Sequence, residues 1–341
     1  MKAARIEEGQ LHIRDVDIPV PGPDEALVRI KAAGVCHSDL HIARGDWAGV
    51  PTSGVIGHEA IGVVEALGPG AERFVAEGDR VILGLGGTGG GYWCGACEYC
   101  LSGSPRHCKQ SKGIMGVFAE QFSVWAPSLV TLPDSVGDDE AALACGGLTA
   151  YGAVKKLQKH GVLPGRRVAV VGAAGGLGHY AVQLATGFGY EVVAVDIGEE
   201  RLEFARSMGA SVAVEAADAI EVVTGLGGVD AVLIFSARMA GFDLGFKLLR
   251  PGGLFVAVGL PPSSEGNLQF NPFELFFRDA TIVYSAVGTV QDMRELVALA
   301  AAGKVTSHVS RRGKLSELES IFDDLEASRY LGRAIVTDLA G

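Results

Sequence analysis

From Arg167 onward, short apolar runs alternate with stretches in which polar and apolar residues have helical spacing. RVAVVG, EVVAVD, VDAVLIF and LFVAVGL are almost continuously apolar, as expected of strands buried on both faces. GGLGHYAVQLATGFG and GEERLEFARSMGA follow the first two runs and have the pattern of amphipathic helices. The alternation predicts an α/β fold in which a doubly wound parallel sheet of the Rossmann type is covered by helices.

The first part of the chain, residues 1–145, has a different pattern. ALVRIKAAGV, IGVVEALG and DRVILGL are short β-type segments separated by glycine and proline, which predicts a small β-rich domain. From about residue 286 the pattern becomes mixed again, and LSELESIFDDLEASRY has the spacing of an amphipathic helix. GLGGTGGG at 84–91 predicts a flexible loop. A chain of 341 residues is long for one core, so we expect two domains.

Charge and hydropathy exclude some classes of partner. The net charge of −11 disfavours binding to nucleic acids and to anionic membranes. Glycines and a histidine interrupt the most apolar stretch, so we interpret it as a buried strand and helix and not as a membrane span. The segment MKAARIEEGQ lacks the apolar core of a secretory signal, and we therefore expect a cytoplasmic protein, in which disulfides are disfavoured.

The turn GAAGGLG follows the strand RVAVVG and begins a helix. Its glycines are Gly172, Gly175 and Gly178, and the first gap is one residue longer than in the strict dinucleotide fingerprint. Asp196 ends the next strand, 18 residues after Gly178, where it would bind ribose hydroxyls and repel a 2′-phosphate. This context predicts an NAD site and favours NAD over NADP, although a glycine turn used only for packing is the alternative.

Four of the six cysteines lie in CGACEYCLSGSPRHC, at 94, 97, 100 and 108. The last gap does not fit the iron–sulfur spacing of ferredoxins, whereas four thiolates suit a closed, tetrahedral zinc site. Such a site has no open position and is expected to be structural. Two disulfides are the disfavoured alternative, and His107 is a possible competing ligand that we interpret as a surface residue.

The segments GVCHSDLH, GHEAIG and ALACGGLTAYG contribute Cys36, His58 and Cys145. These residues are far apart in the sequence. Taken singly, each has an ordinary explanation as a buried cysteine or a core histidine. The ordinary explanations become less favoured when the three motifs are considered together, in their order along the chain with the cysteine loop and the glycine turn.

In that order of motifs, from about Ala33 to the C-terminus, the chain resembles the zinc-dependent alcohol dehydrogenases of the medium-chain dehydrogenase/reductase superfamily. The form GAAGGLG and the chain length are most similar to the tetrameric branch of bacteria and fungi. The resemblance implies a GroES-like catalytic domain over 1–148 and 286–341 and an NAD-binding Rossmann domain over 149–285. It also implies a homotetramer, with a dimer as the alternative, and two zinc ions per chain.

The resemblance also implies roles for individual residues. Cys36, His58 and Cys145 match the catalytic zinc ligands, a set known from alcohol dehydrogenase itself, with Glu59 as an alternate ligand. Asp39 matches the residue that orients the zinc histidine, and Ser38 and His41 match a proton relay that passes through the cofactor ribose. The matches to cofactor contacts are His37, Thr149, Gly172, Gly175, Gly176, Leu177, Gly178, Asp196, Arg201 and Arg333. Trp47 either lines the substrate pocket or packs in the core.

The implied activity is reversible hydride transfer between a zinc-bound alkoxide and NAD, which gives an aldehyde or a ketone. A zinc-free quinone or enoyl reductase of the same fold is one alternative, and a non-enzymatic zinc-loop binding protein is another. The loop at 84–91 and the short segment SKGIMGVFAEQF depart from the family pattern, so the substrate range stays open.

Overall fold

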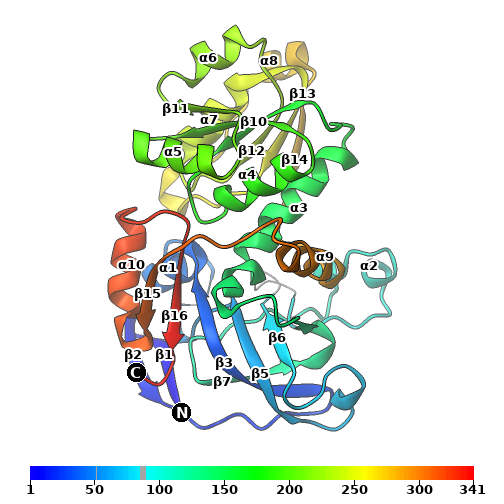
Figure 1. The fold of residues 1–341 in the computed structure, drawn as a ribbon, viewed down its shortest axis with the longest axis vertical. Helices are drawn as coiled ribbons and strands as arrows, with labels where there is room; N and C mark the ends of the chain where they lie inside the picture. The colour runs from blue at the N-terminus through cyan, green and yellow to red at the C-terminus, as the bar shows by residue number, and fades with distance from the viewer. Residues whose placement is uncertain (51, 85–89) are drawn as a thin grey trace. The chain divides into compact units, whose positions relative to one another are not determined.

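The computed structural model describes residues 1–50, 52–84 and 90–341 (Figure 1). The chain divides into two compact units, of which the first comprises Met1–Leu148 and Val287–Gly341 and the second Thr149–Ala286. Ala286 therefore belongs to the second unit, one residue away from the predicted division. Most of the predicted loop at 84–91 lies outside the described residues.

The first unit is rich in β structure, as its short apolar segments predicted. A three-stranded antiparallel sheet has the order β2 (Gln10–Asp15), β1 (Lys2–Glu7), β4 (Gly54–Val55). A seven-stranded sheet has the order β15 (Val309–Lys314), β16 (Arg333–Asp338), β3 (Glu25–Val35), β5 (Ala60–Leu67), β6 (Arg80–Leu83), β8 (Val130–Thr131), with β7 (Gln121–Trp125) also paired to β3. Strand β3 is central, because it pairs with β16, β5 and β7.

The helices of the first unit connect or cover these strands: α1 (His37–Arg44), α2 (Glu98–Leu101), α9 (Val290–Ala301) and α10 (Leu318–Glu326). Helix α10 buries the face formed by Leu318, Ile321, Phe322 and Leu325, which is the spacing that predicted it. It is shorter than the predicted segment at both ends, because a 3₁₀ turn precedes it and the helix ends at Glu326. Helix α3 (Gly146–Lys159) crosses from the first unit into the second.

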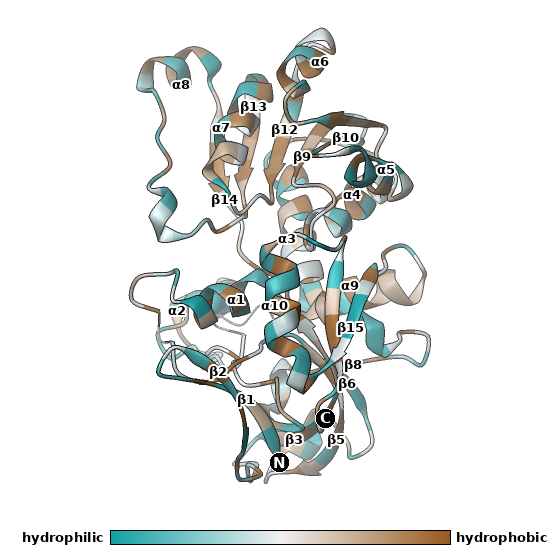
Figure 2. Ribbon diagram, turned by 90° about the vertical axis from the view of Figure 1, so that its left-hand side faces the viewer, coloured by the Kyte–Doolittle hydropathy of each residue, from teal (hydrophilic) through white to brown (hydrophobic). Residues whose placement is uncertain are grey.

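The second unit confirms the predicted doubly wound sheet. All its strands are parallel, in the order β11 (Val212–Glu215), β10 (Glu191–Asp196), β9 (Arg167–Val171), β12 (Val229–Ile234), β13 (Leu249–Ala257), β14 (Thr281–Tyr284). The strand order reverses between β9 and β12, which is where such folds bind dinucleotides. Figure 2 shows these strands as strongly hydrophobic, in keeping with burial on both faces.

Five helices connect the strands of this unit: α4 (Gly178–Gly187), α5 (Glu199–Ser207), α6 (Ala219–Gly225), α7 (Met239–Leu248) and α8 (Pro272–Arg278). The predicted helix from residue 175 begins only at Gly178, because the preceding residues form the glycine turn. In neither unit does any helix within the described ranges combine the length and the apolar run that a bilayer span requires.

Candidate active site

The junction of β3 and α1 places Cys36 and Asp39 side by side. Cys36 has an extended backbone and is the N-cap of α1, and Asp39 is the third residue of that helix. The Cys36 N–H donates to Oδ2 of Asp39 at 3.1 Å, as in a capping box. A carboxylate in the first helical turn also interacts favourably with the helix dipole. Both side chains are buried, so the sequence of this helix start fixes them in place.

His58 lies just before β5, and its ring is held by the same carboxylate. Its Nδ1 is 2.8 Å from Oδ1 of Asp39. The resulting hydrogen bond uses Nδ1 as the donor and leaves Nε2 as the available ligand atom. The predicted role of Asp39 in orienting this histidine therefore has a geometric basis.

Cys36, His58, Glu59 and Cys145 are all buried, and one ligand atom from each lies within 4.8 Å of the others. Ligands at about 2.0–2.3 Å from one zinc ion lie at most roughly 4.6 Å apart, so the group has the size of a zinc site. Two sulfurs and an imidazole nitrogen are also donors that zinc prefers. The residues present therefore fit the metal, and they come from three distant parts of the sequence.

Glu59 forms a buried ion pair with Arg333 of β16, a partner that the sequence did not indicate. Its other oxygen accepts the Gly146 N–H at 3.2 Å. Burial raises the pKa of Glu59 to about 7, although Arg333 opposes that shift. Gly34 has to be glycine here, because a β-carbon would collide with the Glu59 carboxylate. The predicted contact of Arg333 with a pyrophosphate stays a prediction.

The two cysteines of this group differ in acidity. A hydrogen bond from the Cys145 thiol lowers the pKa of Cys36 well below its usual value, against the effect of burial and with help from His58. The pKa of Cys145 is raised by the same interaction with Cys36 and by burial. Cys36 is therefore the sulfur that ionises first, and the thiolate is the form that binds metals.

Helix α1 also carries the residues predicted to form a proton relay. Ser38 is partly buried, and His41, one helical turn further on, is buried. Nδ1 of His41 lies 2.7 Å from Oδ2 of Asp46, and its ring centroid is 4.9 Å from that of Trp47. Asp46 was not predicted as part of this site, although GDW directly follows the helix. His37 is exposed at the first helical position.

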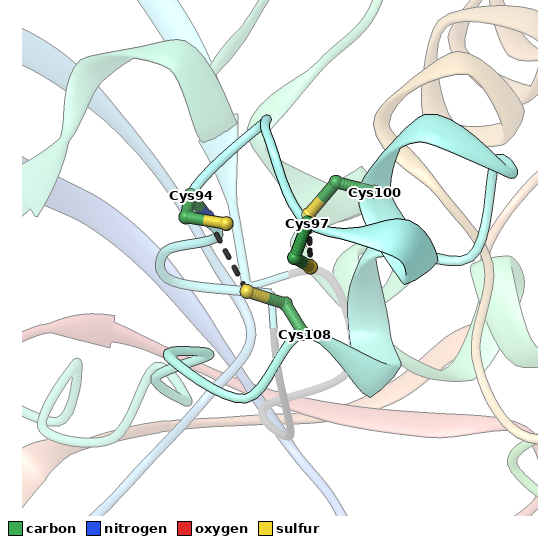
Figure 3. A group of neighbouring side chains, drawn as sticks. All are labelled: Cys94, Cys97, Cys100 and Cys108. Carbon is green, nitrogen blue, oxygen red and sulfur yellow. Dashed lines mark hydrogen bonds between the residues drawn. The ribbon is translucent and has the colours of Figure 1, made fainter.

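The second cysteine group lies around α2 (Figure 3). Ligand atoms of Cys94, Cys97, Cys100 and Cys108 lie within 4.8 Å of one another, and the sulfurs of Cys97 and Cys100 are 3.5 Å apart. N–H groups of Cys94 and Gln110 each donate to Sγ of Cys108 at 3.4 Å. Backbone N–H groups lower the pKa of Cys94 to about 6. Four sulfurs in this space fit a closed zinc site.

Neither disulfides nor His107 take part in this group. None of the six cysteines, all of them within the described residues, forms a disulfide. His107 is exposed in a 3₁₀ turn and its ring contacts Tyr99, in agreement with its interpretation as a surface residue.

In the second unit, the glycine turn joins β9 to α4. Gly172 has a φ of +81°, which disfavours any other residue. A β-carbon on Gly178 would collide with the carbonyl oxygen of Gly172, whereas Gly175 has more room. Gly176 and Leu177 complete the turn, and Leu177 is the N-cap of α4. The extra residue in the first gap is thus accommodated without loss of the tight strand–helix packing.

Asp196 ends β10 and supports this turn. Its Oδ2 accepts the Ala174 N–H at 2.8 Å, and its Oδ1 accepts the Ile197 N–H at 2.9 Å. Arg201 of α5 lies 4.0 Å from Oδ1. Each carboxylate oxygen has a second lone pair, so Asp196 can still accept hydrogen bonds from a ligand. Thr149, buried on α3, is the first residue of this unit.

Comparison with known proteins gives matches over nearly the whole chain. The model of the alcohol dehydrogenase GroES-like domain matches residues 22–134, and that of the zinc-binding dehydrogenase matches residues 176–302. An alcohol dehydrogenase of Geobacillus stearothermophilus is 38% identical, over 98% of this chain and 99% of the relative.

Solved structures agree with these matches. The alcohol dehydrogenase of the archaeon Aeropyrum pernix has a TM-score of 0.88 at 35% identity, and the match covers 99% of this chain and 100% of that one. Acetophenone reductase from Geotrichum candidum, solved in complex with NAD, has a TM-score of 0.85 at 30% identity over 99% of this chain and 97% of its own.

Proposed function

The chain belongs to the zinc-dependent alcohol dehydrogenases of the medium-chain dehydrogenase/reductase superfamily, and from this premise we propose that it reversibly transfers a hydride between an alcohol and NAD. The products of oxidation are an aldehyde or a ketone. The observation that carries the proposal is the buried group of Cys36, His58 and Cys145, which offers three donors of the kind zinc prefers. Three protein ligands leave one tetrahedral position for the substrate.

Zinc in this group would supply a Lewis acid that polarises the substrate oxygen, and NAD would supply the hydride acceptor. The protein's own residues set up this chemistry. Asp39 keeps the His58 ring turned so that Nε2 is the ligand atom. Arg333 compensates the charge of Glu59, which lowers the electrostatic cost of burying that carboxylate among the ligand atoms.

We assign removal of the alcohol proton to two side chains of α1, Ser38 and His41. Ser38 and His41 are three residues apart and therefore share one face of this helix. The Ser38 hydroxyl can both accept and donate a proton, and the His41 imidazole has a ring nitrogen that can take the proton up. Trp47, partly buried against His41, stays the proposed wall of the substrate pocket.

The glycine turn and Asp196 are assigned to the cofactor. Backbone N–H groups at the start of α4 favour a pyrophosphate, and Gly178 keeps the turn close to the helix. The Asp196 carboxylate favours ribose hydroxyls and repels a 2′-phosphate, so we infer a preference for NAD over NADP. Arg201 would support the same ribose.

We infer that the group of four cysteines holds a structural zinc ion. Four sulfurs complete a tetrahedron and leave no position for a substrate. The segment around α2 buries little apolar surface of its own, since all four residues of that helix are partly or fully exposed. A bound ion would therefore hold the segment folded.

For the assembly we infer a homotetramer, with a dimer as the alternative. Support comes from Phe273, Phe276 and Phe277 of α8, which are 70%, 78% and 64% exposed. Strand β14 is also an edge strand within the described sheet, and an open apolar edge favours pairing with another chain. We place the enzyme in the cytoplasm, where six cysteines outside any disulfide would stay reduced.

The experiment is a panel of primary and secondary alcohols, each assayed with NAD and with NADP, on protein whose zinc content has been measured. We expect NADH formation, a lower rate with NADP and two zinc ions for the two ligand groups. Cys145→Ser should abolish turnover, because it removes one catalytic ligand, while circular dichroism should stay unchanged.

Full activity in zinc-depleted protein would instead support the zinc-free reductase. Absence of NADH formation across the whole panel, in protein that holds both zinc ions, would favour the non-enzymatic binding protein. Retained turnover in both Cys36→Ser and Cys145→Ser would contradict the assignment of the catalytic ligands.

A further inference from the structure

His41 has one nitrogen engaged and one without a partner. Its side chain is 6% exposed, and within the described part of the chain the buried Nε2 makes no hydrogen bond. Nδ1 lies 2.7 Å from Oδ2 of Asp46. A buried polar atom without a hydrogen-bond partner costs free energy, which indicates that Nε2 binds another group when the enzyme works.

The position of Asp46 is fixed by the backbone. Helix α1 ends at Arg44 and is capped by Gly45, whose φ of +73° is the left-handed conformation of a helix C-cap. This turn brings the chain back, and the Asp46 N–H donates to the carbonyl of His41 at 3.0 Å. The two residues are thus joined by a main-chain and a side-chain hydrogen bond. The short aspartate side chain therefore holds the imidazole ring in one orientation.

The hydrogen bond also determines which nitrogen carries the proton. An ionised carboxylate only accepts, so Nδ1 must be the donor and Nε2 carries the lone pair. His41 is thereby held in the tautomer in which Nε2 can accept a proton. The other tautomer would place the lone pair of Nδ1 against the carboxylate, and repulsion disfavours it.

No cationic side chain among the described residues competes with His41 for the Asp46 carboxylate. No lysine or arginine among the described residues pairs with Asp46, and its side chain is 34% exposed. Arg44, the nearest cationic residue in the sequence, instead pairs with Glu319 and Asp323 of α10. The other titratable ring nearby is His37, whose centroid is 6.0 Å from that of His41.

We propose that Asp46 is a positioning residue that keeps His41 in one orientation and in the Nδ1–H tautomer. The inference rests on the proposed function. When the alcohol is oxidised, its proton forms the Nε2–H bond of His41 as the donor O–H bond breaks. The ring then carries one positive charge beside the unchanged Asp46 carboxylate, until Nε2 releases that proton to water.

The kinetic test uses the zinc-loaded enzyme with NAD and one primary alcohol. Asp46→Asn should lower kcat roughly tenfold or more, because positioned proton transfer is worth about 100-fold to 10,000-fold in total. The KM for NAD should stay within about twofold of the unchanged enzyme. In a His41→Gln background, Asp46→Asn should have little further effect, since it acts only through His41.

The control is Asp323→Asn, which removes a carboxylate that also pairs with α1 but does not contact His41. Its kcat should stay within about twofold, as expected of an exposed ion pair. A purely structural role for Asp46 would lower the melting temperature and reduce kcat by the same factor in both backgrounds. That result, or an unchanged kcat in Asp46→Asn, overturns the inference.

A second measurement does not need the variant to fold. Histidine-selective ¹⁵N labelling of the unchanged enzyme, with His41→Gln to assign the signal, reports the tautomer directly. We expect His41 to be protonated at Nδ1 at a pH where the ring is neutral. A predominant Nε2–H form overturns the inference even if alcohol is oxidised, whereas absence of NADH formation by the unchanged enzyme overturns the proposed function and this inference together.

Discussion

Nδ1 of His58 lies 2.8 Å from Oδ1 of Asp39, and both side chains are buried. The other carboxylate oxygen accepts the N–H of Cys36, so one aspartate fixes two of the proposed catalytic ligands. Removal of a residue that orients a metal ligand commonly weakens metal binding about 10–100-fold. We therefore expect Asp39→Asn to weaken zinc binding by that factor, measured by competition with a chromogenic chelator.

Asp15→Asn is the control for this prediction, because Asp15 pairs with Lys2 at the surface. It should leave the zinc affinity unchanged. Equal zinc affinity in Asp39→Asn and in the unchanged protein would show that the orientation of His58 does not depend on the carboxylate.

The cysteine group around α2 gives a second prediction. Cys97→Ser removes one of its four sulfurs, so we expect loss of one zinc ion per chain and a lower melting temperature. The alcohol-oxidation rate of the chains that stay folded should be largely retained, since this site has no open position. Elemental analysis and calorimetry provide the measurement.

His107→Ala is the matched control in the same loop, since His107 is exposed and outside the group of four. It should retain both zinc ions. Should Cys97→Ser stop turnover at an unchanged melting temperature, the structural and catalytic assignments of the two groups would have to be exchanged.

The features that the sequence predicted best are local ones. RVAVVG and GAAGGLG are adjacent, so the hydrophobic run and the glycine spacing together indicated a strand, a turn and a helix. The four sulfurs around α2 likewise fall within one short segment. In both cases the chain has little freedom to bring other residues into the site, and the structure agrees with the prediction.

The catalytic group is different, because topology assembles it. Cys36 directly follows β3, and β16 pairs with that strand so that Ala334 lies opposite Val35. Arg333 is thereby brought to Glu59, from which it is 274 residues away in the sequence, and no local pattern could have indicated that pair. The ligands Cys36, His58 and Cys145 were joined by resemblance alone. Asp46 was missed because its function depends on the left-handed turn at Gly45.

A third prediction concerns the glycine turn. Gly178→Ala should disrupt the turn, because its β-carbon would collide with the backbone of Gly172 and Ala173. We expect a loss of stability of about 1–3 kcal/mol, as for overpacking elsewhere, and a loss of NADH binding measured by fluorescence.

Gly187→Ala, in the last turn of the same helix, is the control. A β-carbon there meets nothing within 4 Å, so this variant should be neutral or more stable by about 0.5 kcal/mol. If Gly178→Ala bound NADH as tightly as Gly187→Ala does, close packing of the turn would be irrelevant to the cofactor.

The fourth prediction is the pH dependence of stability in the second unit. Glu265 accepts hydrogen bonds from Arg238 Nη1 and from the Met239 N–H at the start of α7, both at 2.7 Å. The hydrogen bond from Arg238, followed by that from Met239, lowers the pKa of Glu265. Because the folded pKa lies below the unfolded one, the stabilisation is complete above the unfolded pKa and is lost as the pH falls through the folded pKa.

Glu265→Gln should therefore lower the melting temperature near pH 7 and lower it much less at acidic pH, where the native carboxyl is already protonated. Glu203→Gln is the control, since Glu203 is exposed on α5 and far from the start of α7 in the sequence. Its melting curve should follow that of the unchanged protein at every pH. The melting-temperature difference between Glu265→Gln and the unchanged protein could instead be the same at neutral and acidic pH. That result would mean that the glutamate acts through its shape alone, because the charge of a carboxylate changes over this pH range whereas its shape does not.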